Sequence, residues 1–82
     1  MGPVDAVFTG LADVVGIKPQ LLSYTVNAVT GGTDAQAEVT VRLSFNGKPA
    51  VGRGAHNDVI TASARAFLNA LNRVAKDQQE KA

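Results

Sequence analysis

Residues 35–45 alternate without interruption between small or apolar side chains and polar ones. The first set comprises Ala35, Ala37, Val39, Val41, Leu43 and Phe45, and the second comprises Gln36, Glu38, Thr40, Arg42 and Ser44. A period of two predicts a β-strand with one buried and one hydrated face, the usual pattern in an antiparallel sheet. A shift of one residue would bury every polar side chain of the second set, so the pattern fixes the register of this strand.

Two further strands are expected, one on each side of this segment in the sequence. Asn46-Gly47 predicts a tight turn into a strand at about residues 48–53, whose glycines and Pro49 favour an edge position. Residues 21–29 also alternate, and Gly31-Gly32-Thr33-Asp34 is expected to connect them to the central strand. The apolar side of this first strand is predicted to carry Leu22, Tyr24, Val26 and Ala28.

Helical spacing is found near both ends of the chain. The first helix is expected to begin near Pro3 and to stop at Gly16, with an apolar stripe of Val4, Val7, Phe8, Leu11, Val14 and Val15. The last helix is expected from about Asp58 to Lys76, capped by Asn57 or Asp58. Its core stripe is predicted to be Ile60, Ala64, Phe67, Leu71 and Val74, beside a stripe of smaller residues, Val59, Ala62, Ala66 and Ala70.

The predicted order of elements is α-β-β-β-α. This order favours an α+β fold, a two-layer sandwich with a three-stranded antiparallel sheet and both helices on one face. We expect a single domain over residues 1–76 and a frayed polar tail over residues 77–82. Because no strands precede the first helix, the chain reads as a complete βββα unit preceded by the last helix of another.

Charge and composition argue against several classes of function. The 82 residues include eight basic and seven acidic side chains, interleaved along the chain, so no basic stripe for nucleic acid is expected. No apolar run approaches the ~20 residues of a membrane span, and no positively charged region begins a signal peptide. These features predict a cytoplasmic protein that binds neither nucleic acid nor membrane.

Side chains suited to catalysis are sparse. His56 is the only histidine, and no third group is placed to orient it as a base for Ser63. With no cysteine and no second histidine, a zinc site is not expected either. Catalytic residues, metal ligands and cofactor sites are therefore not predicted for this chain.

Two local patterns each allow two interpretations. Gly52-Arg53-Gly54, just before a helix, either binds an anion or lets two backbones approach closely, and the second interpretation is favoured. Tyr24 has Ala28, Ala35 and Ala37 near it on the apolar side of the sheet. These alanines either shape a small apolar pocket or let a helix pack closely.

Several segments, taken in order, resemble one known family. They are Gly2-Pro3-Val4-Asp5-Ala6, Leu22-Ser23-Tyr24 with Val26-Asn27-Ala28, Gly31-Gly32-Thr33-Asp34-Ala35-Gln36 with Glu38-Val39-Thr40-Val41, Gly52-Arg53-Gly54, and Asp58-Val59-Ile60 with Ala62-Ser63 and Ala70-Leu71-Asn72-Arg73. Together they span about residues 2–75 and resemble the C-terminal regulatory domain of 2-isopropylmalate synthase, which senses leucine.

The resemblance implies a function and a set of site residues. Enzymes of this family condense acetyl-CoA with 2-oxoisovalerate in a separate barrel that uses a divalent metal. Their regulatory domain dimerises, binds leucine and inhibits the barrel. This chain would then be a non-catalytic fragment without a cofactor of its own, with the barrel and a second copy as partners. By motif, the leucine pocket would comprise Gly2, Pro3, Ala6, Tyr24, Ala28, Ala35, Ala37 and Val59 or Ile60.

Two alternatives stay open at this point. The related regulatory domain of citramalate synthase responds to isoleucine, and an apolar pocket separates such similar side chains by only about 1–3 kcal/mol. The other alternative is a purely structural dimerisation module with an empty pocket. Ligand-dependent melting distinguishes that module from a sensing domain.

Overall fold

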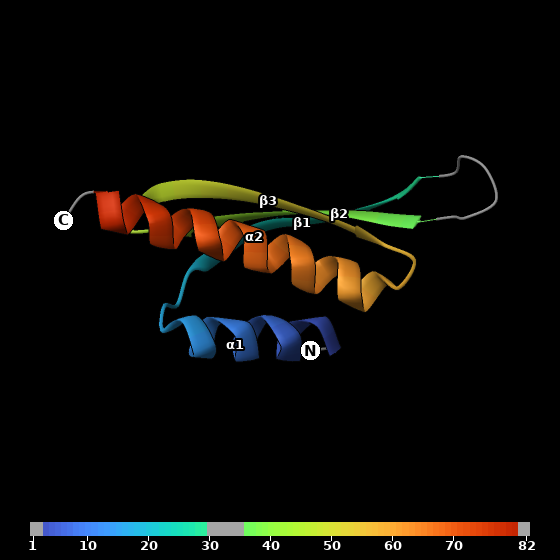
Figure 1. Cartoon of the computed structure of the whole chain (residues 1–82), viewed down its shortest axis with the longest axis horizontal. Coiled ribbons are helices and arrows are strands. Elements are labelled where there is room, and N and C mark those ends of the chain that lie inside the picture. The colour runs from blue at the N-terminus through green and yellow to red at the C-terminus, as the bar shows by residue number, and fades with distance from the viewer. Residues whose placement is uncertain (1–2, 30–35, 81–82) are drawn as a thin grey trace.

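The computed structural model describes residues 3–29 and 36–80. Its elements follow in the order α1 (Pro3–Val15), β1 (Gln20–Val29), β2 (Gln36–Phe45), β3 (Lys48–His56) and α2 (Val59–Glu80). The predicted order and the α+β class are confirmed, with the strands in one layer and both helices on the same side of it (Figure 1). The turn predicted at residues 31–34 lies outside the described residues.

The sheet is antiparallel, in the order β1-β2-β3, with β3 at an edge as predicted. Val41 at the centre is in register with Tyr24 on β1 and with Gly52 on β3. The alternation of β2 is confirmed, because its side chains Val39, Val41 and Leu43 are fully buried whereas Arg42 is exposed. Asn46 and Gly47 take φ angles of 54° and 78°, as a two-residue turn into β3 requires.

β1 departs from the predicted pattern at Leu22. A bulge lies between Leu21 and Ser23, so Leu21 rather than Leu22 is in register with Leu43 of β2. Leu22 is 49% exposed, and its predicted place on the apolar side is wrong. The physical reason is that a bulge inserts one extra residue and shifts the alternation of the strand by one.

α2 packs against β3 so closely that side chains do not fit between the two backbones. A Cβ atom added to Gly54 would lie 2.5 Å from the Ala62 carbonyl oxygen and 2.7 Å from the Ala66 nitrogen. A Cβ atom added to Gly52 would overlap the backbone of Ala66 and Ala70. The close-packing interpretation of Gly52-Arg53-Gly54 is therefore confirmed.

The face of α2 that meets the sheet is the one with the smallest side chains. Ala62, Ala66 and Ala70 are fully buried, and the predicted core residues Phe67, Leu71 and Val74 are buried beside them. Ile60 is 41% exposed, so its assignment to the core stripe is wrong. Because Gly52 and Gly54 have no side chains, the alanine stripe packs directly on β3, and Ile60 in the first turn of α2 is left partly exposed.

α2 is also longer than predicted. It continues to Glu80 rather than ending at Lys76. Residues 77–80 contain neither glycine nor proline, so nothing in their sequence stops the helix where the prediction placed its end.

α1 joins the core mainly through Phe8. The Phe8 ring stacks on Phe67 with centroids 4.2 Å apart and meets the Tyr24 ring edge-on at 5.8 Å. Ala12 is buried one turn later, whereas Val14, predicted to lie in the apolar stripe, is 85% exposed. A helix covered on one side buries only part of a broad apolar stripe, and Val14 lies on the uncovered part.

Gly16 ends α1 as the sequence predicts. Its φ angle is 88°, a conformation that favours glycine. The N–H groups of Gly16 and Ile17 both donate to the carbonyl of Ala12, at 2.8 and 3.2 Å. The chain then turns through Pro19 into β1.

Candidate functional site

The predicted effector residues on the sheet and on α2 gather at one end of the domain. Ala28 and Ala37 are in register with each other, and Ala37 is also in register with His56, the last residue of β3. α2 begins three residues after His56, so Val59 and Ile60 stand in its first turn at this same end. Both of these side chains remain partly exposed to solvent.

The first turn of α1 faces the same side of the domain as the first turn of α2 (Figure 1). Pro3 is its first residue, and Ala6 in the same turn is exposed. The backbone of α1 lies next to α2 and not next to a strand, so its first turn is not placed beside Ala28 and Ala37. Gly2 and Ala35, also predicted for the pocket, lie outside the described residues.

Tyr24 does not lie with this group. It precedes Ala28 by four residues, a separation of about 13 Å along a strand. Its hydroxyl is 2.7 Å from Oγ of Ser63 on α2, and Ser63 is fully buried. The bond supplies the partner that each buried hydroxyl requires. The sequence interpretation weighed Ser63 only as a nucleophile and missed this role, although a serine among buried alanines was a usable signal.

α1, β1 and α2 meet in one cluster, which we call the aromatic junction. It consists of Phe8, Tyr24, Ser63 and Phe67, joined by the ring contacts and the hydrogen bond described above. An aromatic pair of this kind contributes about 0.5–1.5 kcal/mol beyond its buried area. The position of α1 is therefore coupled directly to both the sheet and α2.

Asp58 caps α2, as predicted. Its Oδ2 accepts a hydrogen bond from the Thr61 hydroxyl at 2.8 Å, and its Oδ1 accepts one from the Ile60 N–H at 3.3 Å. The Thr61 hydroxyl and then the Ile60 amide hold the pKa of Asp58 below its ordinary value. The Asp58 N–H donates to Nδ1 of His56 at 3.0 Å, so the single histidine belongs to this cap.

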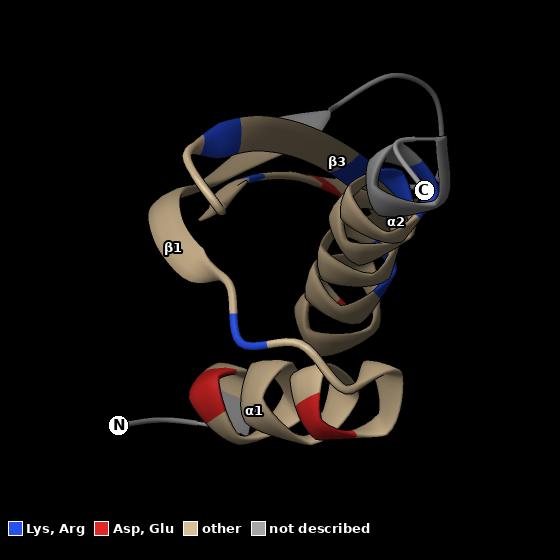
Figure 2. Ribbon diagram, turned by 90° about the vertical axis from the view of Figure 1, so that its left-hand side faces the viewer, with Lys and Arg blue, Asp and Glu red and all other residues tan. Residues whose placement is uncertain are grey.

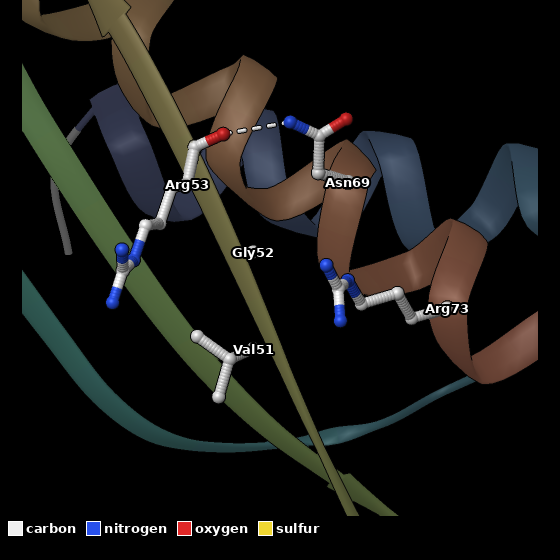
Figure 3. A pocket seen from close by; sticks show the side chains of 5 residues that line it. All are labelled: Val51, Gly52, Arg53, Asn69 and Arg73. Atoms are coloured by element: carbon white, nitrogen blue, oxygen red, sulfur yellow. Dashed lines mark hydrogen bonds between the residues drawn. The ribbon is translucent and has the colours of Figure 1, made fainter.

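Described residues line a cavity on each side of α2. One, of about 600 Å³, lies beside α1, with the apolar side chains of Phe8, Leu21 and Phe67 and the charged ones of Asp13 and Lys18 in its wall. The other, of about 560 Å³, lies between β3 and α2, and its lining consists of Val51, Gly52, Arg53, Asn69 and Arg73 (Figure 3).

Charges that are interleaved along the sequence are separated in space. α1 carries Asp5 and Asp13 and no basic residue. α2 carries Arg65, Arg73 and Lys76 and no acidic residue before Asp77. Figure 2 shows the acidic positions of α1 and the basic positions of α2 on different parts of the domain. Interleaving along the sequence therefore does not carry over to these two helices.

Residues 3–29 and 36–80 also bear on other classes of site. They contain no group of three or more His, Cys, Asp or Glu side chains arranged to hold a metal ion. Within them, neither helix is both long enough and apolar enough to cross a membrane.

The features above define a small α+β domain built around one βββα unit. The chain belongs to the LeuA allosteric (dimerisation) domain family, whose model matches residues 1–75. The resemblance to the regulatory domain of 2-isopropylmalate synthase is thereby confirmed.

Similar proteins agree with this assignment. The chain is 60% identical over 80 residues to a 2-isopropylmalate synthase of Nitratidesulfovibrio vulgaris, covering 98% of the chain and 16% of that protein. A 2-isopropylmalate synthase of Solidesulfovibrio magneticus is 59% identical over the same share of both chains. One from Syntrophus aciditrophicus is 60% identical over 74 residues, covering 90% of the chain and 14% of that protein. The chain thus spans only a small part of the length of these relatives.

Proposed function

We propose that the chain is the leucine-sensing and dimer-forming regulatory part of a 2-isopropylmalate synthase and is itself non-catalytic. The observation that carries this proposal is the match of residues 1–75 to an allosteric (dimerisation) domain. Condensation of acetyl-CoA with 2-oxoisovalerate, with its divalent metal, then belongs to the part of the enzyme outside this chain. The enzyme works in the cytoplasm, where this pathway would run.

The effector site proposed for leucine lies at the end of the sheet where α2 begins, with the first turn of α1 on the same side of the domain. Ala37 is half-buried there, and the nearby Val26, in register with Val39, is 42% exposed because α2 covers β2 and β3 rather than β1. Partly exposed Val59 and Ile60 add apolar surface from α2. Small and partly accessible apolar side chains of this kind suit one branched aliphatic ligand.

The carboxylate of the ligand is assigned to the N-terminus of α1. A helix N-terminus favours an anion, because its first N–H groups lack partners within the helix. The first turn of α2 is already served by the Asp58 carboxylate, which accepts from Ile60. α1 is therefore the helix end to which the proposal assigns the carboxylate.

Self-association is the second part of the proposal. Several large apolar side chains are exposed in the single chain, namely Val14, Leu21, Leu22, Val26, Val59, Ile60 and Leu68. Exposed apolar surface on a small domain commonly marks an interface. A two-fold dimer that covers part of this surface accords with the family description.

The test is a titration of the chain with leucine, isoleucine and valine, followed by amide NMR shifts and by the melting temperature. Leucine should shift resonances of Ala37 and Ile60 and raise the melting temperature, because a ligand bound only by the folded state stabilises it. A stronger response to isoleucine would favour the citramalate synthase assignment. No response to any of the three at millimolar concentration would reject sensing by this chain and leave the structural dimerisation module.

A further inference from the structure

Side chains of α2 and carbonyl groups of β3 are spaced to match along the outer edge of the sheet. Nη1 of Arg65 donates to the Ala55 carbonyl at 3.3 Å, and Nδ2 of Asn69 donates to the Arg53 carbonyl at 2.6 Å. Four residues of helix rise about 6 Å, and two residues of strand rise about 6.6 Å. The next pair in this series is Arg73 with Val51.

This third pair differs from the first two. Arg73 lies beside Val51, and both line the cavity of about 560 Å³ between β3 and α2. Figure 3 shows the Arg73 side chain directed from α2 toward β3, with Asn69 joined to the Arg53 carbonyl next to it. Among the described residues, no hydrogen bond or ion pair is found for the Arg73 guanidinium. It is therefore a planar cation at the side of a cavity, with its donors available.

The surroundings of Arg73 supply no internal counter-ion among the described side chains. β3 contains Lys48 and Arg53 and no acidic residue, and α2 contains none before Asp77. Arg53 lines the same cavity, but its side chain lies on the open face of the sheet, opposite Thr40 and directed away from α2 (Figure 3). Arg73 is therefore the better placed of the two to bind an anion in the cavity.

We infer that this cavity binds a small oxyanion, a molecule carrying a carboxylate or phosphate group, through the Arg73 guanidinium. A guanidinium presents parallel N–H donors that match two oxygens of such a group. Asn69 is held by its bond to Arg53, and Gly52 is fixed against α2, so the wall around Arg73 is rigid before the ligand arrives. This site is separate from the proposed leucine site and shares none of its residues.

A β-strand is a poorer occupant of this edge. An added strand would pair with the outward carbonyl groups of β3. Two of these, on Arg53 and Ala55, already accept hydrogen bonds from α2. A small anion needs none of them, because it is recognised by donors.

The experiment is an NMR titration of the chain with malonate, inorganic phosphate and acetate. Each anion replaces chloride, so that the ionic strength stays constant. Saturable shifts at Arg73, Asn69 and Gly52 are expected with malonate or phosphate. The anion that binds more tightly identifies the oxyanion group that the cavity prefers. Arg73→Gln should weaken binding about tenfold or more, and Arg73→Lys should weaken it less, since it keeps the charge without the planar fork. The matched control is Arg42→Gln, which removes the same charge from the open face of β2 and should change affinity less than about twofold.

Equal weakening by Arg73→Gln and Arg42→Gln, or equal shifts with chloride, would show a general charge effect and overturn the site. A leucine titration of Arg73→Gln should match that of the unaltered chain, which separates failure here from failure of the leucine proposal.

Discussion

The hydroxyl of Tyr24 on β1 and Oγ of Ser63 on α2 lie 2.7 Å apart in the interior of the domain. Ser63 is fully buried, so its hydroxyl has no access to solvent. This bond ties the strand that α2 covers least to the helix itself, next to the ring of Phe8.

Removing both partners of that bond should cost less than the sum of the two single removals. Tyr24→Phe leaves the buried Ser63 hydroxyl without its partner, and we expect a loss of about 1–3 kcal/mol in unfolding free energy. Ser63→Ala should also destabilise, while the double variant should lose less than the sum of the two. Urea unfolding of the four proteins measures this coupling. Fully additive losses would show that the two hydroxyl groups do not stabilise each other.

Gly52→Ala should destabilise the domain severely. The added methyl group would overlap the backbone of Ala66 and Ala70, so α2 must move off β3. A loss of several kcal/mol, of the order of the whole stability of a small domain, is expected in thermal or urea unfolding. The control is Gly10→Ala in α1, where a Cβ atom meets nothing within 4 Å. That change should stabilise by about 0.5–1 kcal/mol, because alanine favours a helix interior.

Ala37→Phe should block leucine binding if the proposed site is correct. Ala37 is half-buried at the end of the sheet where α2 begins, so a large ring there would fill the space assigned to the ligand. Leucine should then cause neither amide shifts nor thermal stabilisation, while circular dichroism remains that of the folded chain. Ala55→Phe places the same ring at an exposed position of β3 and should leave the response intact. A normal leucine response in Ala37→Phe would move the site elsewhere.

Asp58 should contribute a pH-dependent part of the stability. Its folded-state pKa lies below the ordinary value of 3.8, because the Thr61 hydroxyl and the Ile60 amide donate to the carboxylate. The stabilisation is therefore present above pH 3.8 and is lost as the pH falls through the lower folded-state pKa. Asp58→Asn keeps a capping oxygen without this titration. Its deficit in melting temperature relative to the unaltered chain should shrink on acidification, and a constant deficit would contradict the assignment.

Val14→Lys should weaken the dimer and spare the fold. Val14 is 85% exposed in the single chain, so a charge there disturbs only a contact with another copy. Sedimentation at high micromolar concentration should show a larger monomer fraction for this variant than for Thr9→Lys, a change at another exposed position of α1. An 8.5 kDa species alone in the unaltered chain would contradict the dimer itself.

The strand pattern was the most predictable part of the fold. Burial of Val39, Val41 and Leu43 follows from alternation alone, because the period of two assigns each residue of β2 to a face. The bulge at Leu22 could not be predicted in this way, since it depends on how β1 pairs with β2. The alternation of apolar and polar residues continues through Leu22 as in a regular strand, so the sequence gives no sign of the bulge.

The helices were harder to orient than to locate. α2 has two adjacent apolar stripes, and the sequence favoured the larger side chains, including Ile60, for the core. The structure buries Ala62, Ala66 and Ala70 most deeply because Gly52 and Gly54 admit only small side chains. That choice depends on two elements far apart in the sequence. The Ser63 partner of Tyr24 was missed for the same reason.

The contact between the glycines of β3 and the alanines of α2 joins these two elements rigidly. No layer of rotatable side chains separates their backbones at Gly52 and Gly54, so neither can slide along the other without a steric overlap. α1, in contrast, touches α2 through side chains, with the Phe8 ring stacked on Phe67. We therefore expect α1 to tilt about the Phe8–Phe67 stack more readily than β3 and α2 move against each other.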